Sequence, residues 1–155
     1  PNIWPLPMRF SNGSTTLIVA KPAAGAEFFT LTGGQTSKTL TAAFERYSHL
    51  ALPHNVAPAA DSTTTLAAGT VTGVAVTVDD LSEAHPQLET DESYSLYVSS
   101  SGAVAIHAAT IYGALHALET FSQLVVFDFD GGQHTLPLAP WSISDAPRFS
   151  HRGIR

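Results

Sequence analysis

Hydrophobic residues recur at helical spacing in two parts of this 155-residue chain. Over residues 36–52 the apolar positions lie three or four residues apart and charged side chains take the opposite face. These positions are Leu40, Ala43, Phe44, Tyr47 and either Leu50 or Ala51. A second stripe follows Thr110, a residue type that caps helix N-termini, and contains Ile111, Ala114, Leu115, Leu118, Ser122 and Val125, widened by Phe121 and Leu124. We therefore predict two helices.

Other stretches are short apolar runs typical of strands, and residues 73–80, 93–99 and 103–108 alternate between apolar and polar residues as half-buried strands do. Strands are predicted at residues 15–20, 27–32, 73–80, 93–99, 103–108, 125–129, 135–138 and 141–143. Residues 53–70, rich in Ala, Pro, Ser and Thr, are predicted to form a loop, and Asp130-Gly131-Gly132 a hairpin turn. The order β-β-α-β-β-β-α-β-β-β indicates an α+β fold, with two helices on one face of a mostly antiparallel sheet.

Composition narrows the classes of partner. Hydrophobic residues make up 44% of the chain and charged residues 13%, as in one compact domain. A net charge of −6 with only two lysines makes nucleic acid and anionic membrane surfaces poor partners. There is no cysteine, so disulfides and thiolate metal sites are excluded, and no apolar run is long enough for a membrane helix.

Each candidate catalytic or metal motif is incomplete. His116 and Glu119 share a helical stretch, but the second histidine of a zinc motif is missing. Asp128-Phe129-Asp130-Gly131 begins like a calcium loop and lacks its later ligands. Asp79-Asp80 and Asp91-Glu92 are adjacent pairs whose side chains point to opposite faces of a strand, so neither pair can flank one glycosidic bond. We predict no catalytic residue, metal site or cofactor in this chain.

Two further positions are candidate sites. Asn12-Gly13-Ser14 is a glycosylation sequon in a turn-like stretch. Residues 145–155 hold three of the five arginines and read as the entrance to a further domain. The Arg152 guanidinium, with its planar fork of donors, suits either a salt bridge between two domains or a pair of sugar hydroxyls. The residues alone favour the salt bridge.

Three stretches of the chain together resemble the N-terminal part of the β-N-acetylhexosaminidases of glycoside hydrolase family 20. The first is Asn2-Ile3-Trp4-Pro5-Leu6-Pro7, near the start of the chain. The second is Asp91-Glu92-Ser93-Tyr94-Ser95-Leu96 together with residues 106–124, which contain Tyr112-Gly113-Ala114-Leu115. The third is Asp145-Ala146-Pro147-Arg148-Phe149 with His151-Arg152-Gly153.

The resemblance implies that residues 1–145 are the zincin-like accessory domain, a name that describes the fold and no bound zinc. Residues 146–155 are then the linker and the start of the first strand of a (β/α)₈ barrel. In the family, the arginine that matches Arg152 binds hydroxyls of the terminal sugar, so substrate binding becomes the expected role. The catalytic Asp-Glu pair belongs to the barrel, and the chain alone is expected to be inactive.

The same resemblance implies an exo-acting enzyme that removes terminal N-acetylglucosamine or N-acetylgalactosamine with retention of configuration. Its expected partners are the barrel and a glycan or chitooligosaccharide, with a homodimer as a further assembly, in a secreted or lysosomal or vacuolar location. Two alternatives remain open. The chain could be a free-standing carbohydrate-binding or assembly module, or a proteolytically matured subunit that associates with a separate barrel chain.

Overall fold

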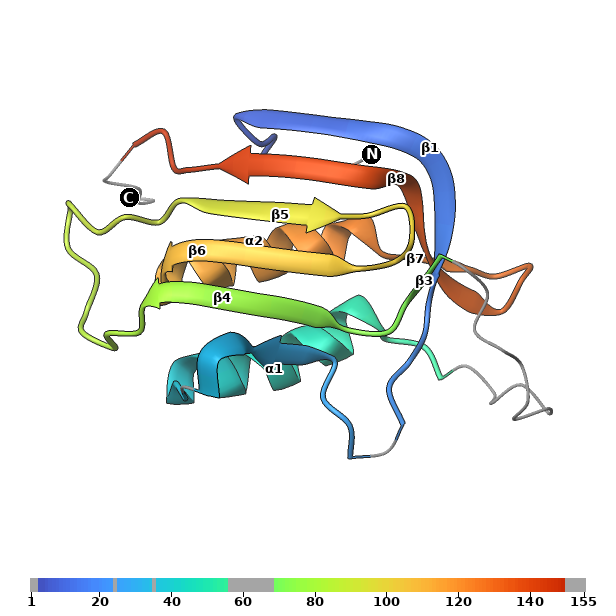
Figure 1. Ribbon diagram of the computed structural model, residues 1–155, viewed down its shortest axis with the longest axis horizontal. Helices are drawn as coiled ribbons and strands as arrows, with labels where there is room; N and C mark the ends of the chain where they lie inside the picture. Colours follow the sequence, from blue (N-terminus) through green and yellow to red (C-terminus); the bar gives the residue numbers. More distant parts are fainter. Residues whose placement is uncertain (1–2, 24, 35, 56–68, 150–155) are drawn as a thin grey trace, which may run out of the picture.

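The protein folds as one mixed sheet with two helices, seen in a computed structural model that describes residues 3–23, 25–34, 36–55 and 69–149 (Figure 1). The elements in chain order are β1 (Arg9–Val19), β2 (Phe29–Leu31), a 3₁₀ turn (Thr32–Gly34), α1 (Lys38–Ala51), β3 (Thr70–Val71), β4 (Val74–Asp80), β5 (Tyr94–Val98), β6 (Val104–Thr110), α2 (Ile111–Leu124), β7 (Val126–Asp128) and β8 (Gln133–Asp145). The α+β class is confirmed, and both helices lie at the predicted positions.

The strands are arranged in the order β2-β4-β6-β5-β8-β1-β3, and β7 pairs with one end of β8. Antiparallel pairing joins β5 to β6, and β8 to β1, β5 and β7. Three pairs are parallel: β1 with β3, β2 with β4, and β4 with β6. Parallel strands need a long crossover, and the connection between β2 and β4 contains α1.

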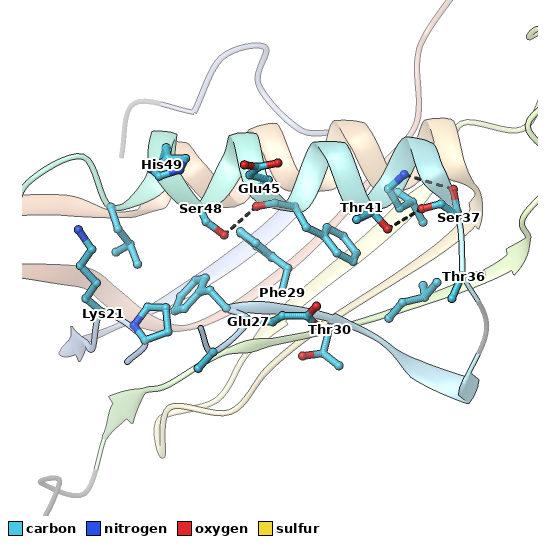
Figure 2. Close-up of a pocket in the computed structure, with 17 residues that line it drawn as sticks. Lys21, Glu27, Phe29, Thr30, Thr36, Ser37, Thr41, Glu45, Ser48 and His49 are labelled. Carbon is cyan, nitrogen blue, oxygen red and sulfur yellow. Dashed lines mark hydrogen bonds between the residues drawn. The ribbon is translucent and has the colours of Figure 1, made fainter. Parts of the chain in front are cut away.

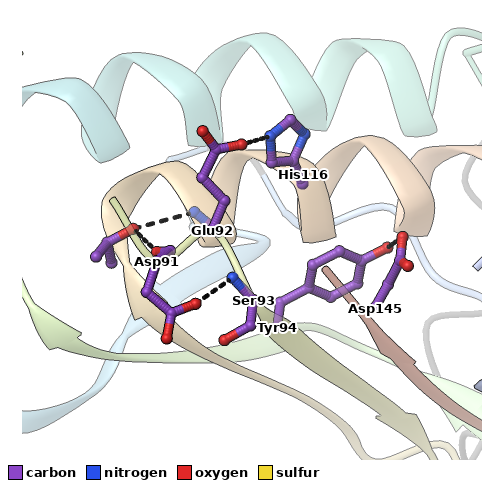
Figure 3. Close-up of polar contacts among 8 residues, drawn as sticks. Asp91, Glu92, Ser93, Tyr94, His116 and Asp145 are labelled. Carbon is purple, nitrogen blue, oxygen red and sulfur yellow. Dashed lines mark hydrogen bonds and ion pairs between the residues drawn. The ribbon is translucent and has the colours of Figure 1, made fainter. Parts of the chain in front are cut away.

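Both helices cover the same face of the sheet, as Figures 2 and 3 show from two directions. Alternate residues of β4, β5 and β6 are buried on that face, and α2 packs against these strands and against α1. Leu40 of α1 and Leu118 of α2 are fully buried. Phe29 meets Phe121 edge to face at 5.7 Å and joins strand β2 to the helices.

The helix starts follow local capping rules. The Thr110 hydroxyl accepts a hydrogen bond from the Gly113 amide at 3.4 Å, so the predicted cap of α2 is confirmed. The Ser37 hydroxyl does the same for the Leu40 amide of α1 at 3.2 Å and donates to Glu83 at 2.7 Å. The sequence left open whether Leu50 or Ala51 completes the buried stripe of α1. Ala51 is buried, whereas Leu50 is 55% exposed. No helix in the described ranges is long and apolar enough to cross a membrane.

Three predictions about the strands need correction. The two strands predicted at residues 135–138 and 141–143 form one strand, β8, whose backbone is irregular at Leu138 (φ 62°). Thr70, which was predicted as loop, and Val71 form β3 beside β1. Strand β1 begins at Arg9, so Asn12 lies in a strand and the turn predicted there is wrong. Backbone pairing with β8 holds this polar segment extended, although its register shifts after Asn12.

Candidate functional site

The candidate site is a groove of about 480 Å³, here called the junction groove, where the two ends of the described chain meet. Its lining residues come from the N-terminal segment, β5, α2 and the segment after β8. They are Trp4, Pro5, Leu6, Tyr94, His116, Glu119, Thr120, Asp145, Ala146, Pro147, Arg148 and Phe149. None of these residues belongs to a loop between strands, so the groove exists only because the two ends of the chain come together.

The exposed side of α2 lines the groove. Within α2, only His116 and Glu119 are exposed, because the rest of the helix packs against the sheet and α1. Glu119 accepts a hydrogen bond from the Tyr47 hydroxyl at 3.0 Å and another from the Gln123 amide at 3.1 Å. His116 contacts Glu92 at 2.8 Å (Figure 3). Both polar residues are therefore engaged in contacts within this domain.

A second polar cluster centres on the buried hydroxyl of Tyr94. It lies 2.6 Å from the Thr120 hydroxyl. It also lies 3.4 Å from an oxygen of Asp145 (Figure 3). The other carboxylate oxygen of Asp145 accepts a hydrogen bond from the Met8 amide at 2.9 Å. Burial, reinforced by the Asp145 carboxylate, raises the pKa of Tyr94 to about 12. This phenol is consequently neutral and structural at physiological pH.

The carboxylates that the sequence singled out also have local partners. Asp79 pairs with His107 at 3.0 Å on the exposed side of the sheet. Asp91 accepts the Ser93 amide at 2.9 Å, and hydrogen bonds from Ser93 lower the pKa of Asp91. Among the described residues, no three His, Asp or Glu side chains gather as metal ligands. In this geometry Asp79 pairs with a histidine and Asp91 accepts a local backbone hydrogen bond.

A second hollow, of about 470 Å³, lies between β2 and α1 (Figure 2). Its polar groups stabilise the helix: the Thr41 hydroxyl donates to the Ser37 carbonyl at 2.8 Å, and the Ser48 hydroxyl donates to the Phe44 carbonyl at 2.7 Å. Phe29 stacks on Phe44 with ring centroids 5.8 Å apart. These contacts make the hollow a feature of helix packing.

Two residues were predicted from the sequence as sites, and the one that the structure describes, Asn12, does not line the groove. Asn12 is exposed on β1, where its side-chain amide donates to the Gly13 carbonyl at 3.0 Å. Arg152 lies outside the described residues. The sequence analysis did not identify the groove residues Trp4, Tyr94 and Asp145 as a site. These three residues lie in three stretches that are 50 or more residues apart in the sequence, and only the fold brings them together.

Comparisons with known proteins identify close relatives of the chain. The family model described as "beta-acetyl hexosaminidase like" matches residues 3–124. Beta-hexosaminidase 1 of Arabidopsis thaliana is 37% identical over 99% of this chain, and beta-hexosaminidase subunit B2 of Dictyostelium discoideum is 32% identical over 99%. The chain spans only 30% and 25% of the lengths of these relatives.

A solved structure shows the same fold. The chitobiase of Flavobacterium johnsoniae aligns with 97% of this chain at a TM-score of 0.68 and 23% identity. The match takes up 21% of the chitobiase chain. In sequence and in structure, therefore, nearly all of this chain corresponds to a small part of each of these longer relatives.

Proposed function

Because the chain belongs to the β-acetyl hexosaminidase-like domain family of glycoside hydrolase family 20, we propose that it is the N-terminal, non-catalytic domain of an exo-acting β-N-acetylhexosaminidase. The observation that carries this proposal is the pair of coverages: two hexosaminidases match 99% of this chain, which spans at most 30% of either. The remaining length of such an enzyme has room for a catalytic barrel.

The proposed enzyme removes terminal N-acetylglucosamine or N-acetylgalactosamine by a substrate-assisted, retaining mechanism. The 2-acetamido oxygen attacks the anomeric carbon, a glutamic acid of the barrel protonates the leaving oxygen, and an aspartate stabilises the cyclic intermediate. This chain supplies neither carboxylate. Its proposed contribution to the pocket is Arg152, which would donate hydrogen bonds to hydroxyls of the terminal sugar.

The boundary proposed between the two domains is residue 145. Strand β8 ends at Asp145, and the following residues Ala146, Pro147 and Arg148 line the junction groove. Residues 1–145 would then form the accessory domain, and residues 146–155 the linker and the start of the first strand of the barrel. We place the enzyme in a secretory, lysosomal or vacuolar compartment, with glycosylation at the exposed Asn12 and a homodimer as its assembly.

The proposal is tested by comparing the full-length enzyme with the 155-residue chain on a chromogenic N-acetylglucosaminide. The full-length enzyme should release the chromophore, and the short chain should not. In the full-length enzyme, Arg152→Ala should lower kcat/KM by about 10- to 100-fold, since a hydrogen bond from a charged group is lost. Arg9→Ala, which removes an exposed arginine of β1, is the control and should leave kcat/KM unchanged. Turnover by the short chain would contradict the proposal.

A second candidate function is a carbohydrate-binding module that works without a barrel. The observation in its favour is the pair of exposed aromatic rings in the groove, Trp4 and Phe149, because sugars stack on such rings. Calorimetry with chitooligosaccharides on the isolated chain discriminates the two. Binding at millimolar concentration or tighter would favour the module, and no binding would favour the accessory domain.

A further inference from the structure

We propose that the indole of Trp4 is the hydrophobic anchor by which this domain holds the catalytic domain that follows it in the same polypeptide. The proposal rests on the proposed function, because it needs a second domain in cis. It assigns a contact role to the N-terminal segment.

The first observation is that the main chain of Trp4 is fixed. The Trp4 amide donates to the side-chain oxygen of Gln123 at 2.7 Å, and the side-chain amide of Gln123 donates back to the Trp4 carbonyl at 3.0 Å. Gln123 is itself held by Glu119, one helical turn earlier in α2. On either side of Trp4, Ile3 and Pro7 are buried. The segment is thus attached to α2 by its backbone and by its neighbours.

The second observation is that the Trp4 side chain does not share this burial. It is 81% exposed, the highest value among the large hydrophobic residues of the described chain. A Trp held at a fixed position and exposed to water loses the large stabilisation that burial of its ring would give. Trp is one of the residue types enriched among the hot spots of protein interfaces.

The third observation is that other exposed apolar side chains lie in the same groove. Leu6 is 56% exposed and Phe149 is 72% exposed, and both line the junction groove with Trp4. They come from opposite ends of the described chain. Exposed apolar groups that gather in one groove mark a contact surface, whereas single exposed residues do not.

The path of the chain argues for the following domain as the occupant. Ala146, Pro147 and Arg148 line the groove, so the polypeptide leaves the fold along the groove itself. In the proposed enzyme the barrel begins within the residues that follow this linker, and the match to the Arabidopsis relative takes up only 30% of that protein's length. A domain tethered this closely meets the groove at a high effective concentration. The groove carries both acidic residues, Glu119 and Asp145, and the cationic Arg148, so the partner surface should be an apolar socket for the indole with polar groups around it.

Hydroxyl-radical footprinting of the full-length enzyme, read by mass spectrometry, tests the contact directly. Oxidation of each residue is normalised to the denatured protein. Trp4 should lose most of its oxidation, while Phe129, which is 78% exposed in the β7–β8 turn, should keep it. Oxidation of Trp4 as complete as that of Phe129 would overturn the proposal. Protection of Trp4 that disappears when a dimer is diluted would also overturn it, since a second copy would then be the occupant.

A pair of variants provides a second readout in the full-length enzyme. Trp4→Ala and Phe129→Ala each remove an exposed ring, so neither change should disturb the core of this domain. We expect Trp4→Ala to lower the melting temperature by about 2–4 °C or more and Phe129→Ala to leave it unchanged. Equal melting temperatures for Trp4→Ala and the unmodified enzyme would overturn the anchor.

The two proposals fail in distinguishable ways. A full-length protein that is inactive on N-acetylhexosaminides but protects Trp4 would refute the proposed function and retain the anchor. An active hexosaminidase in which Trp4 is fully oxidised would refute the anchor and retain the function.

Discussion

At the scale of single residues, the buried hydroxyl of Tyr94 carries more structural weight than its place in a strand indicates. It meets Thr120 at 2.6 Å, and Thr120 is itself buried. We predict that Tyr94→Phe lowers the free energy of unfolding by about 1–3 kcal/mol, because a buried hydroxyl loses its partner. Urea denaturation measures the change. Tyr97→Phe, in the same strand but 53% exposed, is the control and should have little effect; equal effects of both changes would contradict the prediction.

Tyr94 also gives the domain a defined response to alkaline pH. Its pKa is about 12 in the fold, and the ordinary value is 10. Between these two values the unfolded chain loses the proton and the folded chain keeps it. Stability should therefore fall as pH rises from 10 to 12. The spectrophotometric titration of wild type minus Tyr94→Phe should show one phenol that ionises near the upper value; a difference centred at 10 would contradict the assignment.

His134 predicts a response at the acidic end. It is 1% exposed on β8, and neither ring nitrogen has a hydrogen-bond partner. Burial lowers the pKa of His134 below the ordinary value of 6.5, and the neighbouring charges of His54 and Lys21 lower it further. As pH falls below 6.5, His134 is protonated more readily in the unfolded chain than in the folded chain. Stability should therefore decline as pH falls below 6.5.

The measurement is the melting temperature between pH 8 and pH 5 for wild type and His134→Phe. The melting temperature of the variant should fall less between pH 8 and pH 5 than that of wild type, because the buried imidazole of His134 is absent. His107→Gln, which changes an exposed histidine paired with Asp79, serves as the control. A pH profile of His134→Phe identical to that of wild type would exclude His134 as the source.

At the scale of elements, α2 is the central packing element, and it is buried on almost every side. Leu118 is fully buried between the sheet and α1. We predict that Leu118→Ala costs about 2–5 kcal/mol of unfolding free energy, because it removes apolar contacts and leaves a cavity. Leu50→Ala, on the exposed side of α1, should cost far less. Chemical denaturation of both variants tests the difference, and equal costs would show that the wrong helix face is buried.

Gly113 permits the start of α2 to lie close to the backbone of Ser93. A Cβ at this position would lie 2.5 Å from the Ser93 carbonyl, at the start of β5. The Tyr112-Gly113-Ala114-Leu115 motif therefore reports a packing requirement of the helix. The sequence suggested a family through this motif, and the structure gives its physical reason.

At the scale of the whole molecule, β8 is the strand on which the fold depends most. It pairs with β1, β5 and β7, and Leu136, Trp141 and Ile143 are buried along it. The family match, however, ends at residue 124. We predict that a chain cut after Leu124 fails to unfold cooperatively, since β1 and β5 would lose their shared neighbour. A chain cut after Phe149 keeps all the strands of the described residues and should melt in one transition. Circular dichroism during heating compares the two, and a cooperative transition in the shorter chain would contradict the prediction.

The position of β8 also shows where reading the sequence reached its limit. Two strands were predicted, at residues 135–138 and 141–143, whereas the fold has one strand that continues through Ala139 and Pro140 with an irregular backbone at Leu138. The polar start of β1 had no side-chain pattern at all, because its backbone pairing with β8 holds it extended. The parallel pair β4 and β6 alternates buried and exposed residues in the same way as β5, which pairs antiparallel, so the mixed pairing of the sheet was not predictable from spacing.

The sequence by itself determined the two helices and their buried faces, the Thr110 cap, the α+β class and the resemblance to a family. These features depend on residues close together in the chain, whose spacing sets which side chains share a face. The tertiary structure alone decided the strand order, the burial of His134 without a hydrogen-bond partner, and the junction groove. Those features depend on contacts such as that of Trp4 with Gln123, 119 residues apart, and no local spacing specifies which distant segments meet.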